Sequence, residues 1–496
     1  MTTAPDDTPL WLFADQLGPA VYGGEHAHRE VLLVEADSAL RKRRYHRQKL
    51  HLVLSGMRHA AQDLGDRATL LSAATYTDAL ERYGRPVLVH QPTSFAAEEF
   101  VQRLQKRGLV ADILPTPTFA LPRAEFKEWA GRRTRFRMED FYRDQRRRFG
   151  ILMDGSEPVG GRWNYDTDNR EPPPKKQRSL DVPKPYQPRE DDIDDQVRRD
   201  LDQMDLHTVG NDGPRLFAVT PAEARRALTR FIDERLASFG QYEDAMMGQD
   251  WAMSHSLLSV PLNLGVLHPL DAVHAAEQAY RDGQAPLPAV EGFIRQILGW
   301  REYMWHLYWQ FGRDYQDNNK LDVHTPLPDW WTELDADAVD AKCLSTALAG
   351  VRDRGWTHHI QRLMVLGNFA LHRGYHPGEL TDWFATAYVD GFRWVMPPNV
   401  IGMSQHADGG RLATKPYASG GAYINTMSDH CGDCRYDPKK RLGDDACPFT
   451  AGYWAFVQRN EELLAHNNRT ARAVSSMHRL KDLDAVLEQE AAREDF

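Results

Sequence analysis

The 496-residue sequence has no apolar stretch of about 18 residues, the length that a transmembrane helix requires. Its first ten residues, MTTAPDDTPL, contain Asp6 and Asp7 but no Lys or Arg, so they lack the basic start and apolar stretch of a secretory signal. Only four cysteines are present, which excludes a disulfide-stapled scaffold. These absences predict a soluble, cytoplasmic protein.

The chain also lacks an excess of positive charge, because 61 Lys and Arg stand against 71 Asp and Glu. The net charge of −10 excludes a uniformly cationic, histone-like protein, but local basic patches could still bind phosphate. Hydrophobic residues make up 42% of the sequence, enough for a sizeable core, so a disordered chain is excluded as well. At about 150 residues per domain, the length suggests about three domains.

Short apolar runs bounded by turn residues mark the first third of the chain. Leu10–Phe13, Val31–Val34 and Pro86–His90 are typical of buried parallel strands. Helical patterns such as the amphipathic stretch Arg41–Leu64 lie between them. The alternation predicts a doubly wound α/β sheet that binds ligands at the carboxyl ends of its strands. No G-x-G-x-x-G motif follows a strand, so the dinucleotide fingerprint is absent.

From about Pro122 to Arg215 the composition changes. Arg123–Arg148 holds ten basic and five acidic residues, Pro-rich segments follow, and Glu190–Asp205 carries eight carboxylates. Charge-segregated, Pro-rich sequence predicts a long surface connection, and the acidic run predicts a solvated helix face.

Residues 216 to about 465 have a strongly helical pattern. Thr220 predicts a helix start, with Pro221 in the first turn and Glu223 completing a capping box. Similar starts precede Glu291 and Glu379, and the tail from residue 468 predicts a charged, Ala-rich helix. The predicted division is an α/β domain at 1–130, a connector at 131–215 and a helical domain at 216–496.

All four cysteines fall in the helical C-terminal third, at Cys343, Cys431, Cys434 and Cys447. Four thiolates suit either tetrahedral zinc or an iron–sulfur cluster, whereas two buried thiols and a surface pair are the structural alternative. Zinc sites usually use two close pairs. Here one cysteine lies far upstream and the last precedes Pro448, so the spacing favours a four-iron cluster spanning residues 343–447.

Tryptophan and histidine supply further candidates. Ten of the 13 Trp lie between Trp251 and Trp454, and core packing is their usual role, although beside a redox cofactor some could relay electrons. His359 and Arg362 share a helix face and could act as acid and anion clamp, the alternative being a buried structural histidine. The hydroxyls within Met253–Ser259 suggest a phosphate cradle near a helix start.

Two basic stretches, Arg41–Lys49 and Arg132–Arg148, are candidates for phosphate contact. The second interleaves aromatic residues with its arginines. For either stretch alone, a solvated helix face is the competing interpretation.

Together these residues resemble the photolyase/cryptochrome family, and most closely its iron–sulfur bacterial branch, the prokaryotic 6-4 photolyases. The resemblance extends from residue 10 to about residue 465. The segments that carry it are Met138–Arg148, Gly160–Arg170, Glu291–Tyr303, His358–Asn368, Asn399–Gln405, Thr414–Tyr417 and Tyr423–Phe449.

The resemblance implies an N-terminal α/β antenna domain with a doubly wound parallel sheet, a connector, and an all-α C-terminal domain that binds FAD. It also implies a 4Fe–4S cluster on the four cysteines and a 6,7-dimethyl-8-ribityllumazine antenna pigment. The implied reaction is blue-light repair of pyrimidine–pyrimidone 6-4 photoproducts in UV-damaged DNA. Excited, reduced flavin gives an electron to a flipped-out lesion, a proton is transferred, and the electron returns. We expect a monomer with no membrane partner.

Site residues follow from the resemblance position by position. The implied catalytic residues are His359, which matches the proton-donating histidine, its neighbour His358, and the lesion-pocket tyrosines Tyr417 and Tyr423. The implied flavin contacts are Ser256, Leu258, Ser259, Gln296, Arg301, Arg362, Asp390 and Met396. Antenna contacts are expected at Asp15, Gln16 and Glu35, photoreduction at Trp383 and Trp331, and DNA contacts at Lys49, Asp166 and Arg170.

Three positions depart from patterns of the family. Leu363 stands where eukaryotic 6-4 enzymes have a second histidine, which excludes a mechanism that needs two. Phe384 occupies a position where a tyrosine can occur. Met396 stands where the family normally places a hydrogen-bonding residue at flavin N5, and a thioether cannot replace an amide or acid there. We therefore expect altered flavin redox behaviour.

Met396 motivates an alternative function, a cryptochrome-like photoreceptor that uses the same cofactors to signal without repair. A third hypothesis, an iron–sulfur nucleic-acid-binding domain like the primase large subunit, accounts for the four cysteines. It has no use for the α/β half of the chain.

Overall fold

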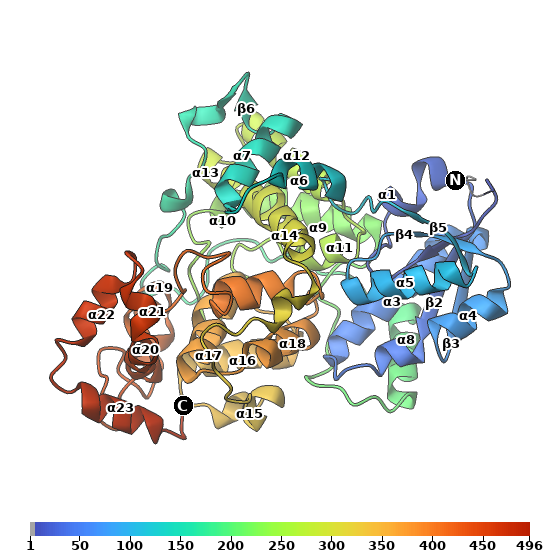
Figure 1. The fold of residues 1–496 in the computed structure, drawn as a ribbon. Helices are drawn as coiled ribbons and strands as arrows, with labels where there is room; N and C mark the ends of the chain where they lie inside the picture. Colours follow the sequence, from blue (N-terminus) through green and yellow to red (C-terminus); the bar gives the residue numbers. More distant parts are fainter. Residues whose placement is uncertain (1–4) are drawn as a thin grey trace.

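The structure is a computed structural model that describes residues 5–496. Figure 1 shows an α/β region at one end of the molecule and a larger helical mass that fills the rest. The α/β region is built on five parallel strands in the order β3-β2-β1-β4-β5. The strands are β1 (Leu10–Leu12), β2 (Val31–Ala36), β3 (Ala68–Ala73), β4 (Val87–His90) and β5 (Val110–Leu114).

This strand order confirms the predicted doubly wound sheet, because the order reverses between β1 and β4. The three predicted strands correspond to β1, β2 and β4, which are buried throughout. The edge strands β3 and β5 did not stand out in the sequence, since both are partly exposed and lack continuous apolar runs.

Five helices belong to the α/β region: α1 (Pro19–Tyr22), α2 (Asp37–Leu40), α3 (Arg47–Leu64), α4 (Tyr76–Tyr83) and α5 (Phe95–Lys106). The hydroxyls of Thr75 and Ser94 cap α4 and α5 by accepting backbone N–H groups at 3.1 and 3.3 Å. Helix α3 begins at Arg47 rather than at the predicted Arg41. His46 is its N-cap and accepts the amide proton of Gln48 at Nδ1, 3.1 Å away.

The connector contains α6 (Arg123–Ala130), α7 (Met138–Phe149), the short hairpin β6 (Met153–Asp154)–β7 (Glu157–Pro158), and α8 (Asp192–Gln203). The acidic run does form a helix, α8, but that helix packs against α3 instead of being solvated throughout. Asp194 is fully buried and accepts from Ser55 at 2.7 Å and Arg215 at 3.0 Å. Burial raises its pKa, but His51, Ser55 and Arg215 outweigh that effect and lower the pKa below its usual value. The solvated face predicted for the acidic run includes the exposed Asp192, Asp195 and Asp202, whereas Asp194 belongs to the side that packs on α3.

The helical part begins at α9 (Pro221–Glu234), where Thr220 caps Glu223 N as predicted. The Glu223 carboxylate accepts from Val219 N and Arg215 instead of completing a capping box. Its other α-helices up to the cysteine-rich segment are α10 (Leu236–Phe239), α11 (Ser259–Asn263), α12 (Pro269–Arg281), α13 (Leu287–Ile294), α14 (Glu302–Phe311), α15 (Asp329–Thr332), α16 (Lys342–Arg354), α17 (Asn368–Arg373), α18 (Pro377–Ala387) and α19 (Gly421–Met427).

Three π-helical turns interrupt this part of the chain: η5 (Arg295–Arg301), η8 (Gln361–Gly367) and η9 (Pro398–Ser404). Such turns are rare and concentrate at functional sites. The sequence pattern did not predict them, because residue composition hardly distinguishes a π-turn from a continuous α-helix.

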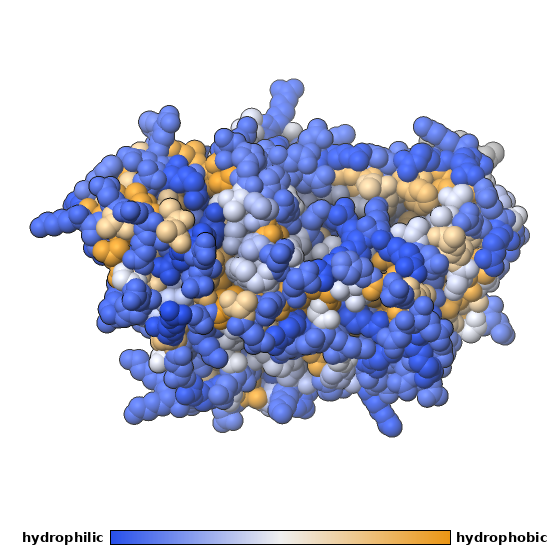
Figure 2. All heavy atoms as spheres, turned by 90° about the horizontal axis from the view of Figure 1, so that it is seen from below, coloured by the Kyte–Doolittle hydropathy of each residue, from blue (hydrophilic) through white to orange (hydrophobic). Residues whose placement is uncertain are grey.

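After residue 447 the chain forms α20 (Pro448–Arg459), α21 (Glu461–Ala465), α22 (Ala471–Met477) and α23 (Leu483–Ala491). The tail is therefore two helices after residue 468 rather than one. Among residues 5–496, no helix is both long and apolar enough to cross a membrane. The face seen in Figure 2 is largely hydrophilic, with small hydrophobic patches.

The α/β region and the helical part share one hydrophobic core, which includes Leu17 and Leu264. The backbone N–H of Leu17 donates to the carbonyl of Leu264 at 2.9 Å. A Cβ atom at Gly18 would lie 1.8 Å from the carbonyl oxygen of Gly265, so this close approach requires glycine. The contact fixes the end of β1 against the helical part.

Candidate functional site

His359 lies two residues before η8 and is exposed at the surface of the helical part. Desolvation by the surrounding protein, and secondarily the charge of Arg362, lower the pKa of His359 to about 4. His359 is therefore neutral near pH 7 and holds one N–H proton.

The side chain of Arg362 is held by hydrogen bonds and by stacking on an aromatic ring. Its Nη1 and Nη2 atoms donate to the two carboxylate oxygens of Asp390 at 2.9 and 3.0 Å, and its Nε donates to Thr357 O at 2.7 Å. The guanidinium lies 4.2 Å from the ring centroid of Tyr388. Bidentate pairing and stacking hold Arg362 in one orientation.

His358, the chain neighbour of His359, stacks on His255, with ring centroids 4.7 Å apart. His358 is buried, and neither of its ring nitrogens has a hydrogen-bond partner among the described residues. Burial lowers the pKa of both rings, that of His255 to about 3. Sequence analysis did not identify this pairing of His255 with His358.

The turn 253–259 lies beside this histidine pair. Leu257 has a φ of 56°, in the left-handed region, a conformation that costs on the order of 1 kcal/mol for a non-glycine residue. Arg235 holds the turn by donating to the carbonyls of Met253 and His255. The Oγ atom of Ser259 is buried without a partner. An unpartnered hydroxyl on a strained turn fits a site for an added acceptor group such as a phosphate.

Gln296 and Arg301 lie at opposite ends of η5. The amide of Gln296 donates to Glu243, and desolvation raises the pKa of Glu243 to about 8. Arg301 donates to Leu262 O at 3.1 Å and lies 4.4 Å from the ring centroid of Phe119. Burial lowers the pKa of Arg301 to about 10.

Charged and phenolic side chains gather at a second part of this region. Asp166 pairs with Arg170 and also accepts from Arg295 at 2.9 Å. The charge of Arg170 acts on the pKa of both Tyr417 and Tyr423, which burial raises. The connector residues Asp166 and Arg170 and the two predicted lesion-pocket tyrosines therefore lie close together.

The predicted electron-transfer residues form a contiguous aromatic pair. The ring centroids of Trp383 and Trp331 are 5.2 Å apart, and those of Trp331 and Trp330 are 5.6 Å apart. Trp383 and Trp331 are buried, whereas Trp330 is half-buried. Phe384 packs edge-on against Trp383.

Met396 is 5% exposed and follows the turn after Asp390. Its thioether is surrounded by an apolar cluster that includes Trp394 and Val400. The surroundings of Met396 are therefore apolar, like its own side chain.

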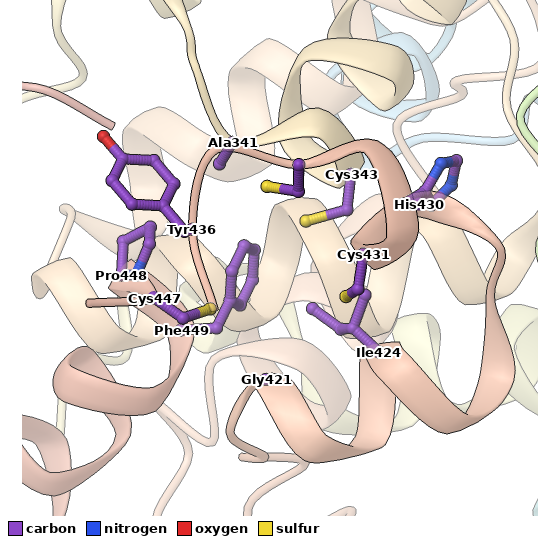
Figure 3. A pocket seen from close by; sticks show the side chains of 11 residues that line it. Ala341, Cys343, Gly421, Ile424, His430, Cys431, Tyr436, Cys447, Pro448 and Phe449 are labelled. Atoms are coloured by element: carbon purple, nitrogen blue, oxygen red, sulfur yellow. The ribbon is translucent and has the colours of Figure 1, made fainter. Parts of the chain in front are cut away.

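The four cysteines line one pocket (Figure 3). Cys343 comes from α16, Cys431 lies within the short helix η10 (His430–Asp433), Cys434 follows the end of η10, and Cys447 is the N-cap of α20. Burial raises the pKa of the Cys343 thiol, and the three other thiols raise it further. Four adjacent thiolates would repel one another, so the set suits a cationic metal centre, and Ile424 and Phe449 give it an apolar wall.

A cavity of about 220 Å³ lies between the α/β region and the helical part. It opens at the carboxyl ends of β1 and β2, and Ala14, Glu35 and Tyr76 form part of its wall. Asp15 and Gln16, the other expected antenna contacts, are not among its lining residues. The Gln16 amide is already hydrogen bonded to backbone groups of its own region.

Lys49 does not contact solvent as a DNA ligand would. It is 7% exposed, and its Nζ donates to the carbonyls of Ala385, Tyr388 and Gly391. Burial lowers its pKa to about 7. The prediction that Lys49 binds a DNA phosphate was wrong, because the ammonium is enclosed between the two parts of the protein.

Other basic residues of the Arg41–Lys49 stretch also pair within the protein. Arg43 pairs with Asp382 at 2.9 Å, and Arg44 pairs with Glu333 of the helical part. Arg41 and Lys42 are exposed and form no ion pair with any of residues 5–496. Arg43, Arg44 and Lys49 thus form an interdomain clamp.

Comparison with known proteins identifies the fold and the family. A model of the family described as "Deoxyribodipyrimidine photo-lyase-related protein" matches residues 10–216. The chain is 40% identical to a (6-4) photolyase of Agrobacterium fabrum over 492 residues, which cover 95% of each chain. The chain belongs to the photolyase/cryptochrome family. This assignment confirms the resemblance seen in the sequence.

Two solved structures have the fold of this photolyase-family chain. A bacterial class III photolyase from Agrobacterium tumefaciens matches with a TM-score of 0.54 at 16% identity, covering 99% of this chain and 94% of its own. A cryptochrome from Synechocystis sp. PCC6803 matches with a TM-score of 0.53 at 13% identity, covering 82% of this chain and 84% of its own. Both matches support an α/β domain joined to a helical domain.

In this photolyase-family chain, several polar residues that lie next to the predicted site residues were not predicted from the sequence. Glu243, His255 and Arg295 contact or surround predicted site residues. Asn263 donates to the carbonyl of Asp390 at 3.1 Å. Each lies on a different segment from its partner. His255 and Arg295 fall within the segments Met253–Ser259 and Glu291–Tyr303 that the sequence singled out, but other residues of those segments were expected to act.

Proposed function

We propose that this protein is a 6-4 DNA photolyase, a light-dependent carbon–carbon lyase that repairs pyrimidine–pyrimidone 6-4 photoproducts. The observation that carries the proposal is the exposed His359, three residues before Arg362, which Asp390 holds in a bidentate pair. The identity to a protein named (6-4) photolyase supports the same lesion class. We propose UV-damaged DNA as the partner, and a monomeric, cytoplasmic state stays a prediction.

The residues around Arg362 and the 253–259 turn fit FAD. The unpartnered Ser259 hydroxyl, with Ser256 and Leu258 on the same strained turn, suits the pyrophosphate, and Arg362 and Asp390 suit the flavin ring system. We keep Gln296, Arg301 and Met396 as further contacts. When bound and reduced, FAD supplies a light-driven one-electron donor that recovers its electron at the end of the cycle.

The chain's own residues supply orientation and the proton. Tyr417 and Tyr423 lie near Arg170 and Asp166 and would hold a flipped-out base away from water. Negative charge on the lesion beside His359 would raise the pKa of the ring, so that the exposed imidazole takes up a proton from solvent and gives a proton to the lesion as imidazolium. His358, its neighbour in the chain, is stacked on His255.

Two further groups fit sites in this chain. Cys343, Cys431, Cys434 and Cys447 would hold a 4Fe–4S cluster, since all four thiols face one apolar pocket. The 220 Å³ cavity beside Glu35 would take an antenna pigment, 6,7-dimethyl-8-ribityllumazine. Trp383 and Trp331 would carry electrons during photoreduction of the flavin. We also propose the division of the chain at 1–130, 131–215 and 216–496.

A repair assay tests the proposed activity. Purified holoprotein, a synthetic oligonucleotide with one 6-4 lesion and blue light should yield the repaired strand, followed by chromatography. His359→Ala should keep FAD and lose repair by about 100-fold or more, because the proton donor is gone. His478→Ala, which removes an exposed imidazole that pairs only with Glu461, is the control. Unimpaired repair by His359→Ala would overturn the assigned role.

Met396 favours one alternative, a cryptochrome-like photoreceptor. This function predicts no repair by the wild-type protein. It also predicts a light-dependent change of protein shape, measured by small-angle scattering, that follows the redox state of the flavin. Repair in the same preparation decides for the photolyase.

A further inference from the structure

Lys49 connects two sites that are remote in the sequence. It is contributed by α3 of the α/β region, and it lines the 220 Å³ cavity together with Glu35 and Tyr45. Its ammonium also reaches across the interface to the segment between Ala385 and Gly391. One side chain is thus shared by the cavity and by a turn of the helical part.

The turn that Lys49 binds carries the groups that fix Arg362. Lys49 Nζ donates to Ala385 O at 2.8 Å, to Tyr388 O at 3.1 Å and to Gly391 O. Asp390 lies between the last two acceptors and forms the bidentate pair with Arg362. The Tyr388 ring stacks on the same guanidinium. The position of Lys49 therefore sets the position of both partners of Arg362.

The hydrogen-bonding capacity of Lys49 is used up. An ammonium has three N–H donors, and the three carbonyls accept all of them. Phe392 lies next to the turn, with its ring centroid 5.3 Å from Nζ, and lines the same cavity. A cavity ligand that accepts a hydrogen bond from Lys49 Nζ has to displace one of these three carbonyls. A ligand that packs on Phe392 contacts the residue that follows the 385–391 turn.

We propose that Lys49 is a positioning residue that couples the occupancy of the interdomain cavity to the geometry of the Asp390–Arg362 pair. This inference rests on the proposed function, because that function places flavin at Arg362 and a pigment in the cavity. It assigns to Lys49 a role different from the DNA contact that the sequence suggested.

The experiment measures the release of FAD from the holoprotein by the recovery of free-flavin fluorescence, with and without added 6,7-dimethyl-8-ribityllumazine. In the wild type, the pigment should change the release rate constant by about fivefold or more, in the range of ordinary coupling between sites. In Lys49→Met the ratio of the two rate constants should fall to about one, although both ligands still bind by absorption. Lys49→Arg, which keeps a charged donor, should restore part of the ratio.

Arg44→Met is the matched control, since it breaks an interdomain ion pair from the same segment without touching the 385–391 turn or the cavity. It should keep the wild-type ratio. If Lys49→Met does not fold, Lys49→Gln, which keeps two N–H donors, replaces it. A wild-type ratio of one, or an unchanged ratio in the folded Lys49 variant, overturns the inference. Wild-type protein that binds FAD and repairs lesions but has a ratio of one leaves the proposed function intact. Wild-type protein without repair contradicts the proposed function instead.

Discussion

His372 is a buried imidazole that the proposed chemistry does not use. Its side chain lies in α17 beneath Phe449 and Phe456, and neither ring nitrogen has a hydrogen-bond partner among residues 5–496. Burial, and then the charges of Arg459 and Arg373, lower its pKa to about 3 from an ordinary value of 6.5. Between pH 6.5 and about pH 3, the imidazole of His372 is therefore protonated in the unfolded chain but neutral in the folded protein.

This difference predicts a pH dependence with a definite sign. The neutral ring contributes its full stability above pH 6.5, and the contribution falls as the pH drops toward 3. Replacing the ring by an apolar group of similar size, His372→Leu, removes that linkage. Between pH 7 and pH 5 the free energy of unfolding of the wild type should fall by about 2 kcal/mol more than that of the variant.

Urea unfolding of both proteins at the two pH values measures the effect. His478→Leu, at an exposed position, should behave as the wild type. Equal pH slopes for the wild type and His372→Leu would show that the imidazole is protonated in the folded protein.

Met396 raises a second question at the scale of one residue, because at the proposed flavin contact its thioether would offer no useful hydrogen bond. Met396→Asn should add one, and one hydrogen bond corresponds to about a tenfold change in an equilibrium or rate. We expect light-reduced flavin in this variant to reoxidise in air about tenfold more slowly. Met396→Leu, with no polar atom, is the control, and equal reoxidation in both variants would contradict the role of the position. Absorption spectroscopy after illumination follows the reaction.

At the scale of elements, local sequence patterns predicted the buried strands and the helix starts, because both depend on neighbouring residues in the chain. Strands β1, β2 and β4 are continuous apolar runs, and helix α18 begins at Pro377 with His376 as its cap. Strands β3 and β5 could not be found this way, because edge strands have mixed burial.

The candidate site divides along the same line. Cys431 and Cys434 were predicted from their spacing, and His359 and Arg362 from sharing a helix face. The contacts of Glu243 and His255 could be identified only from the structure, because their partners come from other segments of the chain. The prediction for Lys49 failed in the opposite way, because it assigned a role that the structure does not allow. A basic residue in a basic segment is expected at the surface, and only the tertiary structure shows that Lys49 is buried.

The cysteine pocket allows a test of an element. Apart from η10, the segment 428–447 between α19 and α20 has no helix or strand, so the metal centre would be its main support. Cys447→Ser should lose the roughly four irons of a 4Fe–4S centre and lower the melting temperature by about 10 °C. Iron analysis and thermal unfolding measure this loss, and limited proteolysis should cut within residues 428–446. Tyr436→Phe, at a non-ligand position of the same pocket, should keep its iron. Full iron content in Cys447→Ser would remove Cys447 from the ligand set.

At the scale of the whole molecule, the net charge of −10 conceals an uneven distribution. In the basic stretch Arg41–Lys49, Arg43 and Arg44 face the helical part and are neutralised there by Asp382 and Glu333. The stretch Arg132–Arg148 is different. Its exposed members that form no ion pair with any residue of 5–496 are Arg132, Arg133, Arg135, Arg137, Arg143 and Arg147.

The second stretch therefore has the free charge that binding to a phosphate backbone needs. Arg143 and Arg147 lie 5.7 and 4.6 Å from the ring centroid of Trp163, which leads into the connector residues Asp166 and Arg170. Each DNA phosphate that an arginine neutralises contributes about 0.9 to the slope of log affinity against log salt concentration. The double variant Arg143→Ala/Arg147→Ala should thus lower that slope by about two and weaken binding to damaged and undamaged duplexes alike.

Fluorescence anisotropy with a labelled duplex at several salt concentrations measures both effects. The matched control is Arg43→Ala/Arg44→Ala, which removes the same charge from the interdomain clamp. It should leave the slope unchanged, because neither arginine is free to meet a phosphate. If the control lowers the slope and the Arg143/Arg147 variant does not, the DNA-binding face lies on the α/β side of the molecule. An acidic protein can bind DNA when its unpaired arginines gather on one face, and the salt slope counts how many of them do so.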